Sequence, residues 1–373
     1  MRLNPALFES GTFVGRVWRD DVNGPALVTL RGGDLVDVTA KGVATMRDLL
    51  ELDDPETWLS GQAGARLGAV EDWSRNLLAP CDLQVIKACG VTFARSMIER
   101  VIEERAAGDP VLAVKIRERV TAIIGDSLRS LKAGSPEAAK VKAALIDEGV
   151  WSQYLEVGIG PDAEVFTKAP ILSSVGWGAD VGIHPISKWN NPEPEVVLAV
   201  NSKGVVKGAA LGNDVNLRDV EGRSALLLGK AKDNNASCSI GPFIRLFDGA
   251  YGMDNVRHAK LDLLIEGEDG FVLRGHSSMS EISRDPLDLV AQTIGAHHQY
   301  PDGFMLFMGT LFAPTEDRGT KGQGFTHKIG DVVTISSAEL GALANTVRLS
   351  TDCAPWTFGI AELMRNLAGR GLL

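Results

Sequence analysis

The sequence lacks the features that mark several common classes of protein. Its apolar runs, such as Val196–Val200 and Ala225–Leu228, fall far short of the roughly 20 residues that a membrane-spanning helix requires. The first residues, MRLNPALFESGTF, carry Pro and Glu where a signal peptide needs an apolar core. No phosphate loop or dinucleotide-binding fingerprint is present. We therefore expect a soluble, cytoplasmic protein that does not associate with a membrane.

Cysteine and net positive charge are also scarce. The four cysteines lack CxxC spacing, which in a chain of 373 residues predicts reduced core thiols rather than disulfides or a zinc site. Lys and Arg number 38 against 48 Asp and Glu, and the formal net charge is −10. Without a basic stripe, such a chain is poorly suited to nucleic acid. An anionic small substrate is still compatible, because a metal and local cations can invert the potential inside a cleft.

Residue patterns divide the chain into two parts. Residues 1–82 combine strand-like runs at Gly11–Val17 and Pro25–Leu30 with a helix candidate at Thr45–Glu51, which predicts a small α+β domain. Residues 83–373 begin with an apolar strand, are rich in strand-like segments from Trp151 to about Leu349, and end with a short helix. The predicted fold class is α+β.

The second part contains a helical insertion at about residues 96–149. Apolar residues recur there at helical spacing, and Ser135, Pro136 and Glu137 resemble a helix start with an N-cap, a proline in the first turn and a carboxylate for the helix dipole. We predict two or three amphipathic helices. A role in packing or oligomer formation is favoured over a catalytic one.

The segment WNNPEPEVVLAVNSKGVVKGAALGNDVNLRD has the pattern of a β-hairpin. Glu193 and Glu195 are two residues apart and so share a face of the first strand. If the turn is a two- or four-residue loop, Asp214 on the second strand lies on that face too. Three converging carboxylates without nearby Cys or His favour Mg²⁺, Mn²⁺ or Ca²⁺ over zinc. Solvent-facing charges at a strand end are the competing interpretation.

The residues after Asp214 support a site that holds a metal and an anion together. A dense polar run, NDVNLRD, is followed by Glu221, Arg223, Lys230 and Lys232. Lys232 could orient a carboxylate, or act as a base if it is desolvated. A surface loop has a similar composition, so both interpretations remain open.

Taken in order, these motifs resemble the fumarylacetoacetate hydrolase superfamily. The matching segments are E-P-E at Glu193–Glu195, N-D-x-x-x-R-D at Asn213–Asp219, the block from Lys232 through Cys238 to Gly241-Pro242, Gly309-Thr310, G-D-V-V at 330–333 and L-A-N-T-V at 343–347. They span roughly Leu83 to Val347, excluding the helical stretch.

The resemblance implies a C-terminal mixed β-roll of the fumarylacetoacetate hydrolase type. It implies that Glu193, Glu195 and Asp214 ligate Mg²⁺, which chelates a 2-oxo acid, and that Lys232 is the active-site lysine. Arg218, Glu221 and Thr310 match positions that the family uses for the substrate pocket. Homodimers or homotetramers are the oligomeric states that the resemblance suggests.

One departure from the family pattern bears on the reaction. Hydrolytic and decarboxylating members carry G-x-N-Y-x-x-H-x-x-E, whereas the aligned stretch from Gly90 keeps Glu99 but has Ser96 in place of the His. A serine hydroxyl does not titrate near neutral pH, so hydrolysis of a carbon–carbon bond loses its base. Ser96 could bond a substrate hydroxyl or cap the helix that begins there.

Among family members, the sequence resembles the 2-keto-3-deoxy-sugar-acid dehydratases in three segments: G-V-T-x-x-x-S from Gly90, W-N-x-P-E-P-E from Trp189 and E-G-R-S-x-L-L-L-G-K-A-K-D-N-N-A-S from Glu221. The implied reaction converts 2-keto-3-deoxy-D-pentonate (2-dehydro-3-deoxy-D-arabinonate, or the D-xylonate-derived acid) to 2,5-dioxopentanoate through a metal-stabilised enolate. Lys232 is the expected base, with a lysine Schiff base as competing chemistry, and Glu99 or a metal-bound water is the expected acid. An acylpyruvate hydrolase or oxaloacetate decarboxylase on this scaffold, and a non-catalytic metal-stabilised binding protein, are the alternatives.

Overall fold

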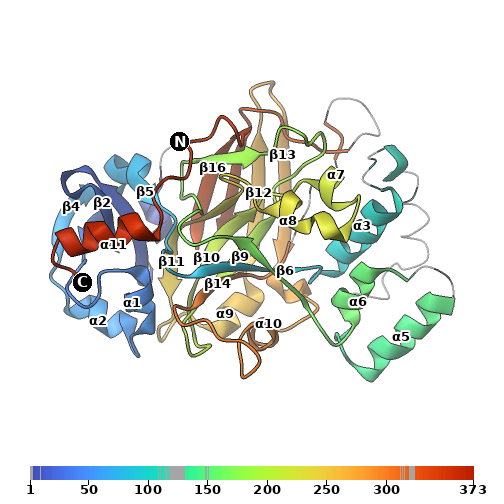
Figure 1. Ribbon diagram of the computed structural model, residues 1–373, viewed down its shortest axis with the longest axis horizontal. Helices are drawn as coiled ribbons and strands as arrows, with labels where there is room; N and C mark the ends of the chain where they lie inside the picture. The colour runs from blue at the N-terminus through green and yellow to red at the C-terminus, as the bar shows by residue number, and fades with distance from the viewer. Residues whose placement is uncertain are drawn as a thin grey trace.

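Two β-sheets form the centre of the molecule, with helices at both ends and along one side (Figure 1). The computed structural model describes residues 3–8, 10–107, 109, 111–113, 116, 131–147, 149, 151–310, 312, 314, 316–318 and 324–373, with the backbone alone at residues 94–96 and 103. The mixed α/β architecture confirms the predicted α+β class and β-roll.

The larger sheet has 11 strands and carries the metal-binding motif. Its strands follow the order β4 (Ala65–Ala69), β3 (Asp34–Asp37), β2 (Gly24–Arg31), β1 (Phe13–Arg19), β11 (Cys238–Leu246), β10 (Val206–Asp214), β9 (Pro194–Val200), β14 (Phe304–Phe307), β6 (Val85–Gly90) and β7 (Glu164–Ala169), with β5 (Leu77–Leu78) on β1. The β14–β6 pair is parallel, whereas β9, β10 and β11 are antiparallel neighbours.

The smaller sheet packs against strands β9, β10 and β11 of the larger sheet. Its five strands follow the order β13 (Val272–Ser278), β12 (Lys260–Glu266), β15 (Val332–Ser337), β16 (Gly341–Leu349) and β8 (Asp180–Ile183). Strand β16 contacts β11 and β10, which joins the two sheets into one core.

The helices lie outside these sheets. They are α1 (Met46–Glu51), α2 (Pro55–Gly61), α3 (Ala94–Arg105), α5 (Pro136–Asp147), α6 (Gln153–Ile159), α7 (Arg218–Glu221), α8 (Leu228–Lys232), α9 (Met253–His258), α10 (Pro286–Thr293) and α11 (Ile360–Gly369), with 3-10 turns η1 (Pro5–Phe8), η2 (Asp20–Val22), η3 (Val70–Asn76), η5 (Ala225–Leu227) and η6 (Met279–Glu281). Over the described residues, no helix is both long and apolar enough to cross a membrane.

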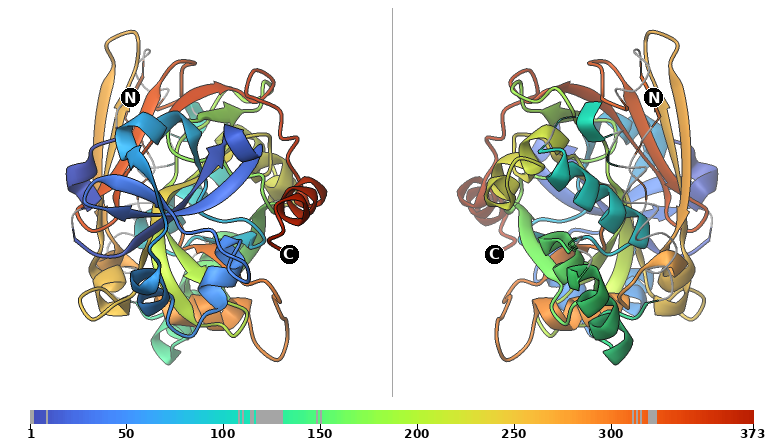
Figure 2. Two further views of the ribbon diagram at one scale, coloured as in Figure 1. Left: turned by 90° about the vertical axis from the view of Figure 1, so that its left-hand side faces the viewer. Right: turned by 90° about the vertical axis from the view of Figure 1, so that its right-hand side faces the viewer.

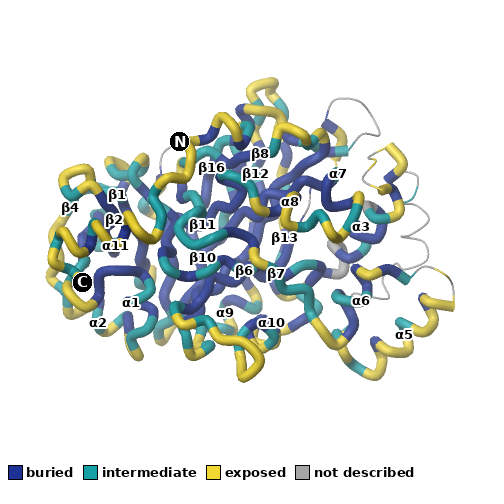
Figure 3. Tube along the Cα trace, in the orientation of Figure 1, coloured by how far each residue is buried: buried dark blue, intermediate teal, exposed yellow. Residues whose placement is uncertain are grey.

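The central strands are buried on both faces (Figure 3). Every residue of β9 and β11 is buried, and alternate residues of β9 contribute to two different apolar clusters, one on each face of the sheet. This explains why β9 reads as a continuous apolar run instead of alternating with polar residues. Strands packed this tightly hold the side chains at their ends in fixed positions.

The N-terminal residues are joined to the larger sheet. Strand β1 pairs with β11, so the sheet continues across the division that we expected at residue 82, and that division stays a prediction. Helix α11, where the predicted final helix forms, returns to the N-terminal strands (Figure 2). Its Asn366 Nδ2 donates to the carbonyls of Val22 and Asn23 at 2.8 and 2.9 Å.

Helices α3, α5 and α6 lie at the opposite end of the molecule (Figures 1 and 2). They share an apolar cluster that includes Met97, Leu145 and Tyr154. As predicted, α5 begins at Pro136 after Ser135, whose Oγ accepts from the Ala138 amide at 3.1 Å. The four cysteines are buried and free, which confirms the prediction of reduced core thiols.

Candidate active site

The hairpin formed by β9 and β10 places Glu193 and Asp214 directly opposite each other. The Asn201 amide donates to the Val205 carbonyl, so residues 202–204 form a three-residue loop. With an odd number of loop residues and no other irregularity, Asp214 would point to the face of the sheet opposite that of Glu193. A β-bulge between Val206 and Gly208 adds one residue to β10, which returns Asp214 to the same face as Glu193. Our condition of an even loop was therefore wrong, but the shared face that it predicted is present.

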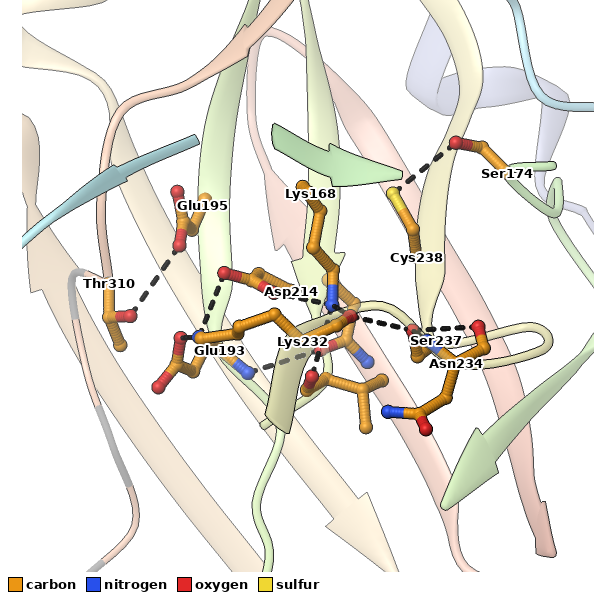
Figure 4. A network of polar contacts seen from close by, with 12 residues as sticks. Lys168, Ser174, Glu193, Glu195, Asp214, Lys232, Asn234, Ser237, Cys238 and Thr310 are labelled. Carbon is orange, nitrogen blue, oxygen red and sulfur yellow. Dashed lines mark hydrogen bonds and ion pairs between the residues drawn. The ribbon is translucent and has the colours of Figure 1, made fainter. Parts of the chain in front are cut away.

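The three predicted metal ligands converge in the interior. Glu193, Glu195 and Asp214 each offer one oxygen within 4.8 Å of the others, and their residues are 2%, 1% and 2% exposed (Figure 4). Burying three carboxylates together is unfavourable unless cations or hydrogen-bond donors compensate them. The surrounding side chains supply that compensation.

Two cations each hold one oxygen of a ligand. Arg100 Nη2 donates to Glu193 Oε1 at 2.6 Å. The Lys168 ammonium lies 2.7 Å from Asp214 Oδ1 (Figure 4). In each carboxylate the second oxygen, Glu193 Oε2 or Asp214 Oδ2, points to the ammonium of Lys232, at 2.5 and 2.9 Å respectively.

Glu195 is held by the Gly309-Thr310 motif. The Gly309 amide donates to Glu195 Oε2 at 2.6 Å, and Thr310 Oγ1 lies 3.5 Å from Oε1. Gly309 has φ +99°, and a Cβ there would lie 1.9 Å from Thr92 Oγ1. Only glycine fits this turn, which brings the amide to the carboxylate.

The charges within the cluster follow from these contacts. Burial opposes ionisation of Glu193, but Lys232 and Arg100 outweigh it and lower its pKa to about 2. Burial and the neighbouring Asp214 and Glu193 raise the pKa of Glu195 well above its usual range. Burial disfavours the Lys232 ammonium, but Asp214 and Glu193 outweigh it and raise its pKa.

These residues fit a small divalent cation. Arg100, Lys168 and the Gly309 amide each contact one oxygen of a different carboxylate. The opposite oxygens face Lys232 or Thr310, side chains that a metal could replace. Mg²⁺ prefers such oxygen ligands in octahedral geometry and keeps positions for water or substrate. A dication would also relieve the repulsion that raises the pKa of Glu195.

Lys168 is a residue of the site that the sequence did not lead us to expect. Its side chain is fully buried, and its ammonium also donates to the carbonyls of Val215, at 3.2 Å, and of Lys232. Lys168 therefore connects Asp214 to the backbone of Lys232.

Arg100 was missed as well, because we expected the helical stretch to serve packing. Helix α3 delivers its guanidinium to two carboxylates, with Nη2 at Glu193 and Nη1 2.6 Å from Glu221 Oε2. The helical segment therefore contributes a side chain that touches a candidate metal ligand.

A small cavity adjoins Glu193 and Asp214 and has about 20 Å³ of room, enough for about one water molecule. Its lining includes Cys89, Gly90, Val91, Arg100, Glu164, Phe166, Glu193, Asp214, Glu221, Lys232 and Thr310. Glu221, Lys232 and Thr310 are thus brought together as the sequence predicted.

Glu164, at the start of β7, is the third residue that sequence reasoning missed. Its carboxylate lies over Gly90, where a Cβ would be 1.8 Å from Glu164 Oε2. Burial and the negative charge of Glu221 raise the pKa of Glu164 to about 7. A carboxyl group with this pKa can take up and release a proton near neutral pH.

A simple pattern could have found two of these residues. In EVFTKA (β7), Glu164, Phe166 and Lys168 alternate and so share one face of the strand. Two charged residues on the inward face of a strand indicate a polar site beneath it. The signal was missed because it lies well before the carboxylate motif.

Arg218 and Glu99 lie beside the cavity and not in its lining. Arg218 Nη2 donates to Glu99 Oε2 at 3.3 Å, Nη1 donates to the Pro314 carbonyl at 3.1 Å, and the guanidinium stacks 4.5 Å from the Trp189 ring. Ser96 falls within α3, but its side chain lies outside the described part of the chain.

Comparison with known proteins agrees with this geometry. Residues 164–348 match the family described as fumarylacetoacetate (FAA) hydrolase, C-terminal. A curated relative, the "Probable 2-keto-3-deoxyxylonate dehydratase" of Haloferax volcanii, is 26% identical over 256 residues, which are 69% of this chain and 84% of the relative. The "2-dehydro-3-deoxy-D-arabinonate dehydratase" of Saccharolobus solfataricus is 28% identical over 188 residues, 50% of this chain and 58% of the relative.

Solved structures share the fold. An apo form of 2-keto-3-deoxy-D-arabinonate dehydratase superposes with a TM-score of 0.62 at 18% identity, over 90% of this chain and 99% of that one. A structure of 2-keto-3-deoxy-D-arabinonate dehydratase complexed with magnesium and 2,5-dioxopentanoate has the same TM-score of 0.62 at 17% identity, over 90% and 99% of the two chains. Residues 164–348 of this chain therefore form a domain of the fumarylacetoacetate hydrolase family.

Proposed function

We propose that the protein is a Mg²⁺-dependent hydro-lyase that converts 2-keto-3-deoxy-D-pentonate to 2,5-dioxopentanoate. The names of both curated relatives and the magnesium–product complex of a structural neighbour support this reaction. The observation that carries the proposal is the cluster of three convergent carboxylates, two of which share a cavity with Glu164, whose pKa of about 7 suits proton transfer.

The cofactor that we propose is Mg²⁺, held by Glu193, Glu195 and Asp214. A bound Mg²⁺ supplies an electrophile that polarises the 2-oxo group and acidifies the protons on C3. The protein holds the three ligand side chains in place before the metal arrives, through Arg100, Lys168 and the Gly309 amide. Mn²⁺ and Ca²⁺ are the other ions compatible with this donor set.

We assign proton abstraction from C3 to Glu164. Sequence reasoning favoured Lys232 as the base, but Asp214 and Glu193 keep the Lys232 ammonium protonated in the metal-free protein. Glu164 and Glu221 are further carboxylates that line the same cavity. A base must be unprotonated before the reaction, and at neutral pH a substantial fraction of Glu164 is ionised. Both side chains line the same cavity.

Loss of the C4 hydroxyl requires a proton, which Glu164 returns after taking one from C3. The C4–oxygen bond breaks, water leaves and a C3–C4 double bond forms. Movement of one proton from C5 to C3 then gives the enol of the 5-aldehyde. The Lys232 ammonium, which also lines the cavity, stabilises negative charge that develops on oxygen.

Glu221 and Thr310 are the substrate-binding residues that the cavity supports. Arg218 and Glu99 form an ion pair beside it, so we propose that they support the wall of the pocket and that Glu99 is not the acid. A contact of Ser96 with a substrate hydroxyl stays a prediction from the sequence, as do a cytoplasmic location and a homodimer or homotetramer. Light scattering of the purified protein will measure the oligomeric state.

A substrate comparison tests the proposed function. The purified protein is incubated with 2-keto-3-deoxypentonate, acylpyruvate or oxaloacetate, each with Mg²⁺ and with EDTA. We expect Mg²⁺-dependent formation of 2,5-dioxopentanoate alone. Turnover of only acylpyruvate or oxaloacetate would replace the dehydratase by a hydrolase or decarboxylase, and no turnover of any substrate would favour a binding protein.

Borohydride trapping tests the chemistry separately. With 2-keto-3-deoxypentonate present, a Schiff base on Lys232 would be reduced to a stable adduct and detected by mass spectrometry. We expect no adduct, because a protonated lysine is a poor nucleophile.

A further inference from the structure

The ammonium of Lys232 lies between two of the three carboxylates proposed as metal ligands. It contacts Glu193 Oε2 at 2.5 Å and Asp214 Oδ2 at 2.9 Å, and Lys232 is only 2% exposed (Figure 4). The other oxygen of each of these carboxylates is held by a second cation, Arg100 or Lys168. The two oxygens bound to Lys232 are therefore the ones left for a metal.

The Lys232 ammonium and a metal ion cannot both bind these two oxygens closely at the same time. A dication close to both oxygens would repel an ammonium that is within 3 Å of the same atoms. The ammonium must then move away or share the carboxylates at a large electrostatic cost. Arg100 and Lys168 do not face this conflict, because each contacts the opposite oxygen of its carboxylate.

We propose that Lys232 is an internal, displaceable counter-ion that occupies the cation position of the metal-free site. Metal binding expels its ammonium toward the adjoining cavity. The proposal rests on the metal site of the proposed function, and it adds that the protein competes with its own cofactor for two ligands.

The cavity offers the displaced ammonium a favourable destination. Glu164 and Glu221 line it, so carboxylates remain within the reach of a flexible lysine side chain. The Phe166 ring, with its centroid 5.8 Å from Nζ, also faces it. Metal loading would thereby move the ammonium away from the two ligands and toward the side of the cavity that Glu164 and Glu221 line.

Equilibrium binding of Mn²⁺ tests the proposal without any catalytic readout. Metal-free wild-type protein, Lys232→Met and Lys232→Gln are titrated with Mn²⁺ at mildly alkaline pH, and free Mn²⁺ is followed by electron paramagnetic resonance. Lys230→Met is the matched control, because Lys230 is an exposed lysine on the same helix. Glu195→Gln, which should weaken binding strongly, shows that the signal reports this site.

We expect both Lys232 variants to bind Mn²⁺ more tightly than wild type by about tenfold or more, because a competing cation and its repulsion are removed. Lys230→Met should bind as wild type does. Equal or weaker binding by the Lys232 variants would overturn the proposal, since a merely structural lysine would leave the affinity unchanged or reduce it.

Wild-type crystals provide a second measurement that does not depend on the variants folding. Lys232 Nζ should lie near Glu193 and Asp214 in crystals grown with EDTA, and should leave both after Mn²⁺ is soaked in. An ammonium that stays in place beside the bound ion would overturn the proposal. Neither result depends on which substrate is turned over, so failure here is distinct from failure of the dehydratase assignment.

Discussion

At the scale of single residues, Glu164 makes the proposed reaction depend on pH. Its pKa of about 7 is set by burial and by the nearby charge of Glu221. A base acts in its ionised form, so kcat/KM should rise with pH to a plateau and fall about tenfold per pH unit well below the pKa of Glu164. The nearby positive charge of bound Mg²⁺ should place this pKa at or below its metal-free value of about 7. A pH–rate profile with saturating Mg²⁺ measures this acidic limb, the part of the profile in which kcat/KM rises with pH.

Glu164→Gln removes the base and keeps the size of the side chain. We expect kcat to fall by about 10²–10⁴-fold and the remaining activity to lose the limb near neutral pH. Binding of Mn²⁺ should persist, because Glu164 is not a proposed ligand. Full activity of this variant, or an unchanged pH profile, would remove Glu164 from the mechanism.

Gly90 gives a second test of the same carboxylate. In Gly90→Ala the new methyl group would lie 1.8 Å from Glu164 Oε2, so this flexible side chain must move. We expect kcat to fall by about tenfold or more, because small displacements of a catalytic group are costly. The free energy of unfolding should change by no more than about 1 kcal/mol, as measured by urea denaturation.

Gly249→Ala is the matched control, because nothing lies within 4 Å of a Cβ at that position. Its kcat should equal that of wild type. A Gly90→Ala enzyme with normal kcat would show that the position of Glu164 is not critical.

The sequence predicted some residues of the site and not others for a physical reason. Glu193, Glu195 and Asp214 could be predicted because they lie on one hairpin, where strand alternation sets which side chains share a face. Arg100 and Glu164 reach the site from a helix and a strand that only the tertiary fold brings there.

At the scale of elements, the bulge in β10 decides whether the ligands meet. The three-residue loop would direct Asp214 away from Glu193, and the extra residue at Lys207 reverses this. Deletion of Lys207 should therefore abolish Mn²⁺ binding, measured by the same resonance titration, because it shifts the register by one residue. Lys207→Ala keeps the residue count and should retain the affinity.

The deletion protein must be shown to be folded by circular dichroism before its affinity is interpreted. A folded deletion variant that binds Mn²⁺ as wild type does would show that the strand recovers its register in another way.

The helices and strands themselves were largely predictable, since α1, α11, β1 and β2 form where apolar periodicity indicated. The face to which Asp214 points could not be predicted with certainty, because a bulge leaves no local pattern in the segment VNSKGVVKGAALGND.

At the scale of the whole molecule, the first 82 residues and the catalytic strands share one sheet. Strand β1 pairs with β11 through Phe13 and Val14, and the ring of Phe8 packs edge-to-face against Phe13 of β1 and Phe243 of β11. The sequence showed a change in pattern near residue 82, but patterns do not reveal hydrogen bonds between distant strands.

A truncated chain of residues 83–373 should not give a monodisperse, metal-binding protein. Removal of β1 exposes the edge of β11 and the apolar residues beneath it, which favours aggregation. Size-exclusion chromatography with light scattering measures this outcome. A monodisperse fragment with wild-type Mn²⁺ affinity would establish residue 82 as a true domain boundary.

The origin of the site residues in different elements has a consequence for evolution. The proposed metal ligands lie on or directly beside β9 and β10 in the sheet core, whereas Arg100 and Glu221 come from helices α3 and α7 outside it. Substitutions in those helices can reshape the pocket without repacking the buried strands. New substrate preferences can therefore be sampled in these helices while the inherited chemistry of the core is conserved.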